Sequence, residues 1–93
     1  MEMTYLALVV DDDLNVVSTV KKMLEYGGMR CVIANTGEQA LELFEAGKFD
    51  IVLTDLQMPN INGLHVISEI TKIDPVQPIM VMTGIERKAK ISI

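Results

Sequence analysis

Three short apolar runs in this chain each lead into an acidic or hydroxyl-bearing residue, and this arrangement constrains the fold more than any other feature. A continuous apolar run of this length is typical of a strand that is covered on both faces, as in a parallel sheet. If the three runs are neighbouring parallel strands, the polar residues after them meet at one edge of the sheet. The runs and the residues that follow them are 6–10 with Asp11 and Asp12, 51–54 with Asp55, and 79–82 with Thr83.

The segments between the apolar runs predict helices. Apolar residues recur at helical spacing after Asp13, after Thr36 and after Gly63. Asp13 is a candidate helix cap, and Thr36 with Gln39 matches a capping box. The alternation of strands and helices predicts an α/β fold with an open parallel sheet, right-handed crossovers and helices on both faces. The predicted strands are 5–10, 29–34, 51–54 and 79–82, and the predicted helices end at Gly27, at Gly47 and at Asp74.

Length and composition indicate one folded domain. The chain has 93 residues, of which 49% are hydrophobic, so it has enough apolar side chains for a core. The net charge of −5 argues against binding to nucleic acid or to an anionic membrane. No apolar run is long enough to span a membrane, and no signal peptide is visible. Cys31 is the one cysteine, which we interpret as a small buried core residue, and we expect a reducing, cytoplasmic location.

The predicted sheet edge carries Asp11, Asp12 and Asp55. Two carboxylates about 4 Å apart repel each other by about 4 kcal/mol at an effective dielectric constant of about 20. A cluster of three therefore shares protons or holds a cation. Hard oxygen ligands favour Mg²⁺, Mn²⁺ or Ca²⁺, and a magnesium site of this kind suits phosphoryl transfer to a carboxylate. A hydroxyl group such as that of Thr83 would hydrogen-bond a phosphoryl oxygen.

The motifs at these strand ends resemble those of the receiver domain of two-component response regulators. Asp55 lies 44 residues after Asp11, and Thr83 lies 28 residues after Asp55, spacings that fit this family. Each motif alone is a weak signal, but the set in this order at strand ends is specific. In the family, Pro59 and Gly63 would shape the loop after the phosphorylation site. The matching motifs are Val9-Val10-Asp11-Asp12, Thr54-Asp55 with Met58-Pro59 and Gly63, and Met82-Thr83-Gly84.

The resemblance implies a role for each motif residue. Asp55 resembles the aspartate that accepts a phosphoryl group from a histidine kinase or phosphotransfer protein. Asp12 resembles the direct metal ligand, and Asp11 resembles the residue that supports it or binds through water. The backbone carbonyl of Gln57 and the carboxylate of Asp55 would complete the protein ligands of Mg²⁺, with Mn²⁺ or Ca²⁺ as alternatives. Thr83 resembles the switch residue that turns toward the phosphate.

The resemblance covers residues 5–84 and implies a flavodoxin-like topology with strand order 2-1-3-4. The last helix, strand and helix of a receiver are not expected here, and neither is the strand lysine that pairs with the phosphate. Lys88 and Lys90 come too soon after the threonine motif to replace it. We therefore expect a truncated receiver over residues 1–84 and a polar, irregular tail over 85–93. The open edge of the fourth strand predicts self-association.

Two functions remain open at this point. The first is a regulatory phosphoacceptor, which is not an enzyme although it assists its own phosphorylation and dephosphorylation. The alternative is an interaction or dimerisation module that keeps the receiver scaffold without using phosphate. An aspartyl-phosphate hydrolase is disfavoured because Gln57 occupies the usual position of the general acid. A nucleotide-binding enzyme is disfavoured because no glycine-rich loop with a lysine follows the first strand. We expect no direct contact with nucleic acid or membrane.

Overall fold

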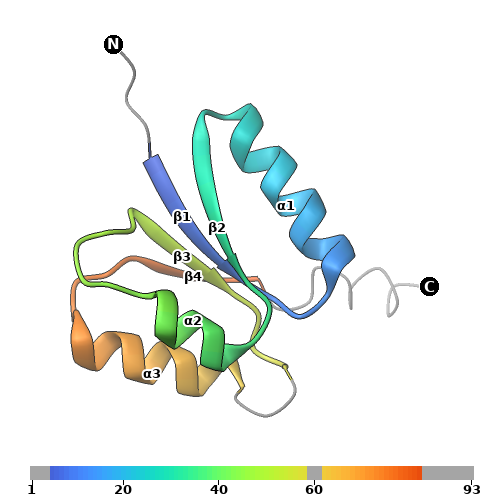
Figure 1. The fold of residues 1–93 in the computed structure, drawn as a ribbon. Helices are drawn as coiled ribbons and strands as arrows, with labels where there is room; N and C mark the ends of the chain where they lie inside the picture. Colours follow the sequence, from blue (N-terminus) through green and yellow to red (C-terminus); the bar gives the residue numbers. More distant parts are fainter. Residues whose placement is uncertain (1–4, 59–61, 83–93) are drawn as a thin grey trace.

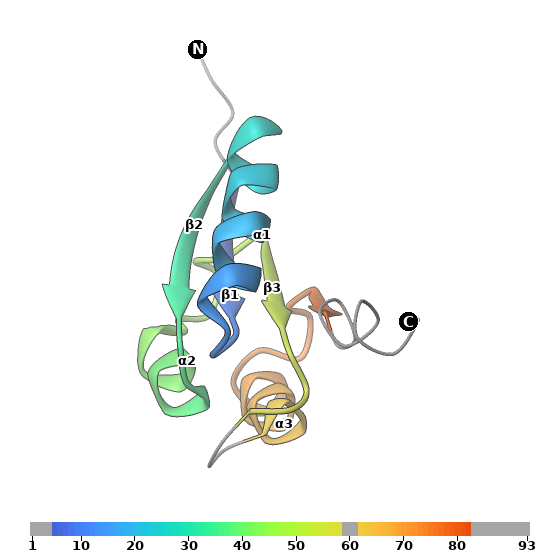
Figure 2. The same cartoon turned by 90° about the vertical axis from the view of Figure 1, so that its right-hand side faces the viewer.

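The computed structural model describes residues 5–58 and 62–82. These residues form a four-stranded parallel sheet in the order β2-β1-β3-β4, which confirms the predicted α/β topology. Helix α1 covers one face of the sheet, and α2 and α3 cover the other (Figures 1 and 2). The strands are β1 (Tyr5–Val10), β2 (Met29–Ala34), β3 (Ile51–Thr54) and β4 (Ile79–Val81), and the helices are α1 (Leu14–Tyr26), α2 (Gly37–Leu43) and α3 (Gly63–Ile73).

Two apolar clusters hold the layers together, one on each face of the sheet. Successive strand residues point to opposite faces, so each strand contributes to both clusters. The larger cluster joins the sheet to α2 and α3 and includes Leu8, Val10, Val52, Val66 and Ile70. The smaller cluster lies under α1 and includes Ala7, Val9, Val16, Val20 and Leu53.

Side-chain caps begin all three helices of the described residues. Asp13 accepts hydrogen bonds from the backbone N–H groups of Asn15 and Val16, which confirms its predicted role. Thr36 accepts from the N–H of Gln39 at 3.0 Å, as a capping box requires. The side chain of Gln39, however, accepts from Asn35 rather than from Thr36, so the return bond of the box is displaced by one residue. The third cap is Asn62, whose side chain accepts from the backbone N–H of His65, an exposed residue.

Helix α2 ends at Leu43, so the predicted end at Gly47 is wrong. Phe44 leaves the helical path, with a φ of −71° and a ψ of 132°. Its ring becomes buried and stacks with Phe49 at a centroid distance of 6.1 Å. Burial of this aromatic pair therefore outweighs the local helical signal. Gly47 instead occupies a turn with a positive φ of 81°.

Several apolar side chains are more exposed than the sequence predicts. Cys31 packs against the smaller cluster but is only partly buried. The prediction of a buried core residue is therefore wrong in the extent of burial. Burial raises the pKa of the Cys31 thiol, and the nearby Glu25 carboxylate raises it further, against the opposing effect of Lys21. Met80 is 56% exposed, although methionines mostly indicate core positions. Strand β4 ends at Val81, one residue before the predicted end of the fourth strand.

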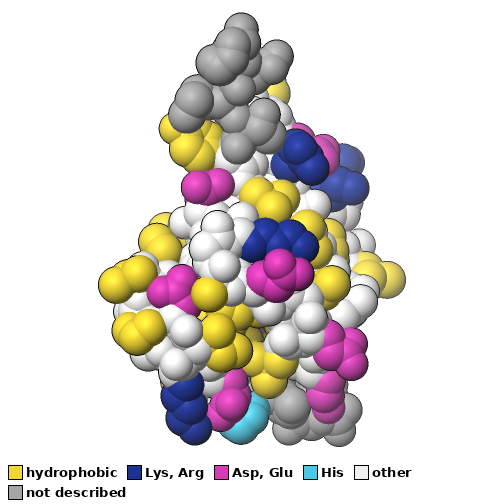
Figure 3. All heavy atoms as spheres, turned by 60° about the vertical axis from the view of Figure 1, so that its left-hand side comes forward, with side chains coloured by type: hydrophobic (Ala, Val, Ile, Leu, Met, Phe, Trp, Pro, Cys, Tyr) yellow, Lys and Arg dark blue, Asp and Glu magenta, His cyan; other side chains and the backbone are white. Residues whose placement is uncertain are grey.

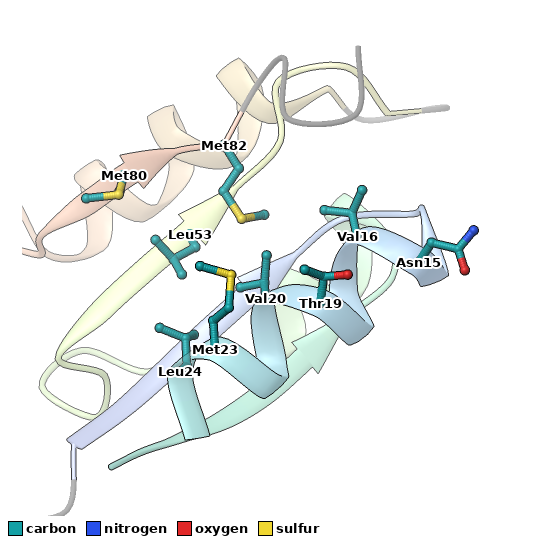
Figure 4. A pocket seen from close by; sticks show the side chains of 9 residues that line it. All are labelled: Asn15, Val16, Thr19, Val20, Met23, Leu24, Leu53, Met80 and Met82. Carbon is teal, nitrogen blue, oxygen red and sulfur yellow. The ribbon is translucent and has the colours of Figure 1, made fainter. Parts of the chain in front are cut away.

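Helix α1 leaves part of its face of the sheet uncovered. An apolar groove of about 530 Å³ lies between α1 and the β3–β4 side of the sheet. Figure 4 shows Met80 and Met82 on one wall, Met23 on the other, and Leu53 between them.

The outer surface mixes side chains of different kinds. Figure 3 shows acidic, basic and hydrophobic side chains interspersed over one face of the molecule. Within the described part of the chain, no helix has both the length and the apolar character needed to cross a membrane.

Candidate functional site

The sheet register brings the strand ends to one level. Val10 at the end of β1 pairs with Ala34 of β2 and with Thr54 of β3, and Thr54 pairs with Val81 of β4. The next residue along each of β1 and β3 is an aspartate. The hydrogen bonds of the sheet continue into these residues, since the Asp11 N–H donates to Ala34 and the Asp55 N–H donates to Val10. The backbone N–H groups of both aspartates are therefore held by the sheet.

Three carboxylates converge at this edge. Oxygen atoms of Asp11, Asp12 and Asp55 all lie within 4.8 Å of one another. Asp11 is 2% exposed and Asp55 is 3% exposed, whereas Asp12 is open to solvent. Carboxylates this close repel one another by several kcal/mol per pair in a partly buried setting, of the order of 4 kcal/mol at 4 Å. A set of oxygen ligands of this charge fits a hard divalent cation that keeps part of its water shell.

A hydrogen bond from the residue that caps α1 orients the Asp11 carboxylate. The Asp11 side chain accepts from the backbone N–H of Asp13 at 2.9 Å. Asp13 in turn caps α1 with its own side chain. The positive end of the helix dipole therefore lies close to the acidic cluster and reduces its self-repulsion. One short segment thus ends a strand, begins a helix and supplies two carboxylates.

The loop after β3 passes close to the start of α3. The Gly63 N–H donates to the Leu56 carbonyl at 2.8 Å. A Cβ atom on Gly63 would lie 2.6 Å from the Cα of Leu56 and would also overlap the Asp55 carbonyl oxygen. Only a residue without a side chain allows this approach. The Thr54 hydroxyl donates to the same Asp55 carbonyl at 3.0 Å.

The other predicted site residues are placed less fully. Gln57 lies in the loop after β3 with its side chain exposed. Thr83, the predicted switch residue, lies outside the described residues, and so do Pro59 and the predicted tail. The sequence analysis includes Thr54 in a motif but gives its hydroxyl no role, although a hydroxyl group in an otherwise apolar, buried strand was a usable signal.

Comparisons with known proteins identify the family. The family model for the response regulator receiver domain matches residues 7–92, so this chain belongs to that family. Receivers are regulatory domains of two-component systems rather than enzymes. The transcriptional regulatory protein ZraR of Escherichia coli is 37% identical over 77 residues, which is 83% of this chain and 18% of ZraR. The chain therefore spans less than a fifth of the length of that relative.

Solved structures agree with this assignment. The response regulator TrrA of Thermotoga maritima, in complex with Mg²⁺ and BeF, has a TM-score of 0.82 and 35% identity, over 95% of this chain and 77% of TrrA. A complex of TrrA with the histidine kinase ThkA has a TM-score of 0.80 and 38% identity, over 86% of this chain and 69% of the solved chain. The fold of this protein is therefore the flavodoxin-like receiver fold.

Proposed function

We propose that this chain is a phosphoaccepting receiver domain, which takes a phosphoryl group onto Asp55 in the presence of Mg²⁺. The observation that carries the proposal is the convergence of three carboxylates within 4.8 Å at the carboxyl ends of β1 and β3. The regulatory character of the family supports it. In this proposal, the receiver unit ends at residue 84, and residues 85–93 form a separate tail.

Each residue of the site has a part in the proposed transfer. A carboxylate oxygen of Asp55 attacks the phosphorus atom, the bond from phosphorus to the donor nitrogen breaks, and that nitrogen keeps the electron pair. Asp11, Asp12, Asp55 and the Gln57 carbonyl would hold the metal. When bound, Mg²⁺ supplies positive charge that neutralises the transferring group. Thr83 would then turn toward the phosphoryl oxygens.

The proposed phosphodonor is a histidine kinase or a phosphotransfer protein. The complex between TrrA and a histidine kinase supports this choice, since TrrA is 38% identical to this chain in that structure. Both partners would meet in the cytoplasm. Asp12 is the exposed member of the carboxylate cluster, so the cluster reaches the protein surface at that residue.

Acetyl phosphate with Mg²⁺ tests the proposal directly, because it supplies phosphate without a kinase. We expect the mass of the intact protein to rise by one phosphoryl group, and we expect no gain for Asp55→Asn. Asp74→Asn is the matched control, because Asp74 is an aspartate at the end of α3, far along the chain from the cluster, and should accept phosphate like wild type. Equal phosphorylation of wild type and Asp55→Asn would exclude Asp55 as the acceptor.

We also infer that copies of this chain associate through β4. Among the described residues β4 is the last strand of the sheet, and its Met80 and Val81 are 56% and 42% exposed. The apolar groove beside α1 adjoins the same strand. Sedimentation at micromolar concentration should show an oligomer for wild type and a monomer for Met80→Lys, with Tyr26→Lys as an exposed control away from β4. A compact wild-type monomer would contradict this inference.

A further inference from the structure

We propose that Thr54 is a positioning residue for phosphoryl transfer, because its buried hydroxyl fixes the backbone that carries Asp55 and Gln57. The inference rests on the proposed function of the acidic site. Thr54 is the last residue of β3 and is fully buried. The Thr54 hydroxyl donates to the backbone carbonyl of Asp55, at 3.0 Å.

A hydroxyl at this position is unexpected from packing alone. The other residues of β3 are Ile51, Val52 and Leu53, all apolar. Thr54 points to the same face as Val52, which belongs to the larger cluster under α2 and α3. Burial of a hydroxyl is unfavourable unless it makes a hydrogen bond, whereas valine has nearly the same shape without that requirement. The hydrogen bond to Asp55 is therefore what distinguishes threonine from valine here.

The structure fixes two consecutive carbonyl groups of the loop. The Asp55 carbonyl accepts from the Thr54 hydroxyl, and the Leu56 carbonyl accepts from the Gly63 N–H at 2.8 Å. The Asp55 N–H is held by Val10 of β1. The next carbonyl along the chain is that of Gln57, the predicted backbone ligand. Rotation of the peptide between Asp55 and Leu56 would therefore move both the phosphoacceptor and that ligand.

The test measures Mg²⁺ affinity by calorimetry, well below the melting temperature of each variant. We expect Thr54→Val to bind Mg²⁺ about tenfold more weakly than wild type, the loss typical when a group that orients a metal ligand is removed. We expect Thr54→Ser to bind with nearly wild-type affinity, because it keeps the hydroxyl. Val52→Ala is the control for general destabilisation, since it should lower the melting temperature without changing the Mg²⁺ affinity.

The possible outcomes separate this inference from the proposed function. If wild type and Thr54→Val bind Mg²⁺ equally, the positioning role is overturned while the metal site stands. If wild type binds no Mg²⁺, both proposals fail together. Should Thr54→Val fail to fold, Thr54→Ala and Thr54→Ser isolate the hydroxyl: weaker binding by Thr54→Ala supports the inference, and equal binding overturns it.

Discussion

Replacement of Gly63 by alanine gives a sharp test of how α3 meets the loop after β3. The new Cβ would lie 2.6 Å from the Cα of Leu56 and 2.8 Å from the carbonyl carbon of Asp55, with the Asp55 carbonyl oxygen nearer still. All of these are backbone atoms, so no side-chain rotation relieves the overlap. Either the loop moves away from α3, or α3 shifts as a whole.

Two effects of opposite sign set the magnitude for Gly63→Ala. Alanine is favoured over glycine within a helix by up to about 1 kcal/mol. Overpacking in a rigid setting costs about 1–3 kcal/mol or more, and contact with backbone places this site at the upper end. We therefore expect a net loss of about 2 kcal/mol in the free energy of unfolding. For a domain of this size, that corresponds to a fall in melting temperature of about 8–16 °C.

Thermal unfolding followed by far-ultraviolet circular dichroism measures this change. The method suits this chain because it needs no tryptophan, and the chain has none. Gly27→Ala is the matched control, because its Cβ would have its nearest neighbour at 3.5 Å, an ordinary contact, and its φ is −84°. We expect Gly27→Ala to melt close to wild type. If Gly63→Ala melts at or above the temperature of wild type, the close approach between α3 and the loop is wrong.

Two further predictions concern other parts of the molecule. Asp13→Ala should lose about 1 kcal/mol of unfolding free energy in urea, because two backbone N–H groups of α1 lose their acceptor, and Asp13→Asn should retain most of it; equal stability of all three proteins would contradict the cap. The raised pKa of Cys31 leaves less thiolate at a given pH, so alkylation near pH 8 should be slower than for an unstructured cysteine peptide. Glu25→Gln should lower that pKa and speed the reaction, and an unchanged rate would remove the electrostatic part of this explanation.

The sheet and the acidic edge were predictable because they depend on patterns along the sequence. Each strand coincides with a mainly apolar run, and the two central strands β1 and β3 are largely buried. Parallel strands bring their carboxyl ends to one edge of the sheet, whatever the path of the loops. The end of α2 was not predictable, because it depends on Phe44 packing against Phe49. No local pattern signals that contact.

The supporting contacts around Asp55 were harder to foresee. Gly63 was expected only to shape a loop, and its close approach to the backbone of Asp55 appears only in three dimensions. The bond from the Thr54 hydroxyl to the following carbonyl depends equally on the path of the chain after β3. The sequence indicates which residues reach the edge of the sheet. It does not readily indicate which contacts hold their backbone in place there.

Titration of the isotope-labelled chain with Mg²⁺, followed by amide chemical shifts, tests most directly whether one ion occupies the strand edge. Saturable shifts confined to the ends of β1 and β3, including the Asp13 amide that bonds to Asp11, are the predicted result. Shifts that never saturate, or that cluster in another part of the sheet, would show that these three carboxylates do not act as one site.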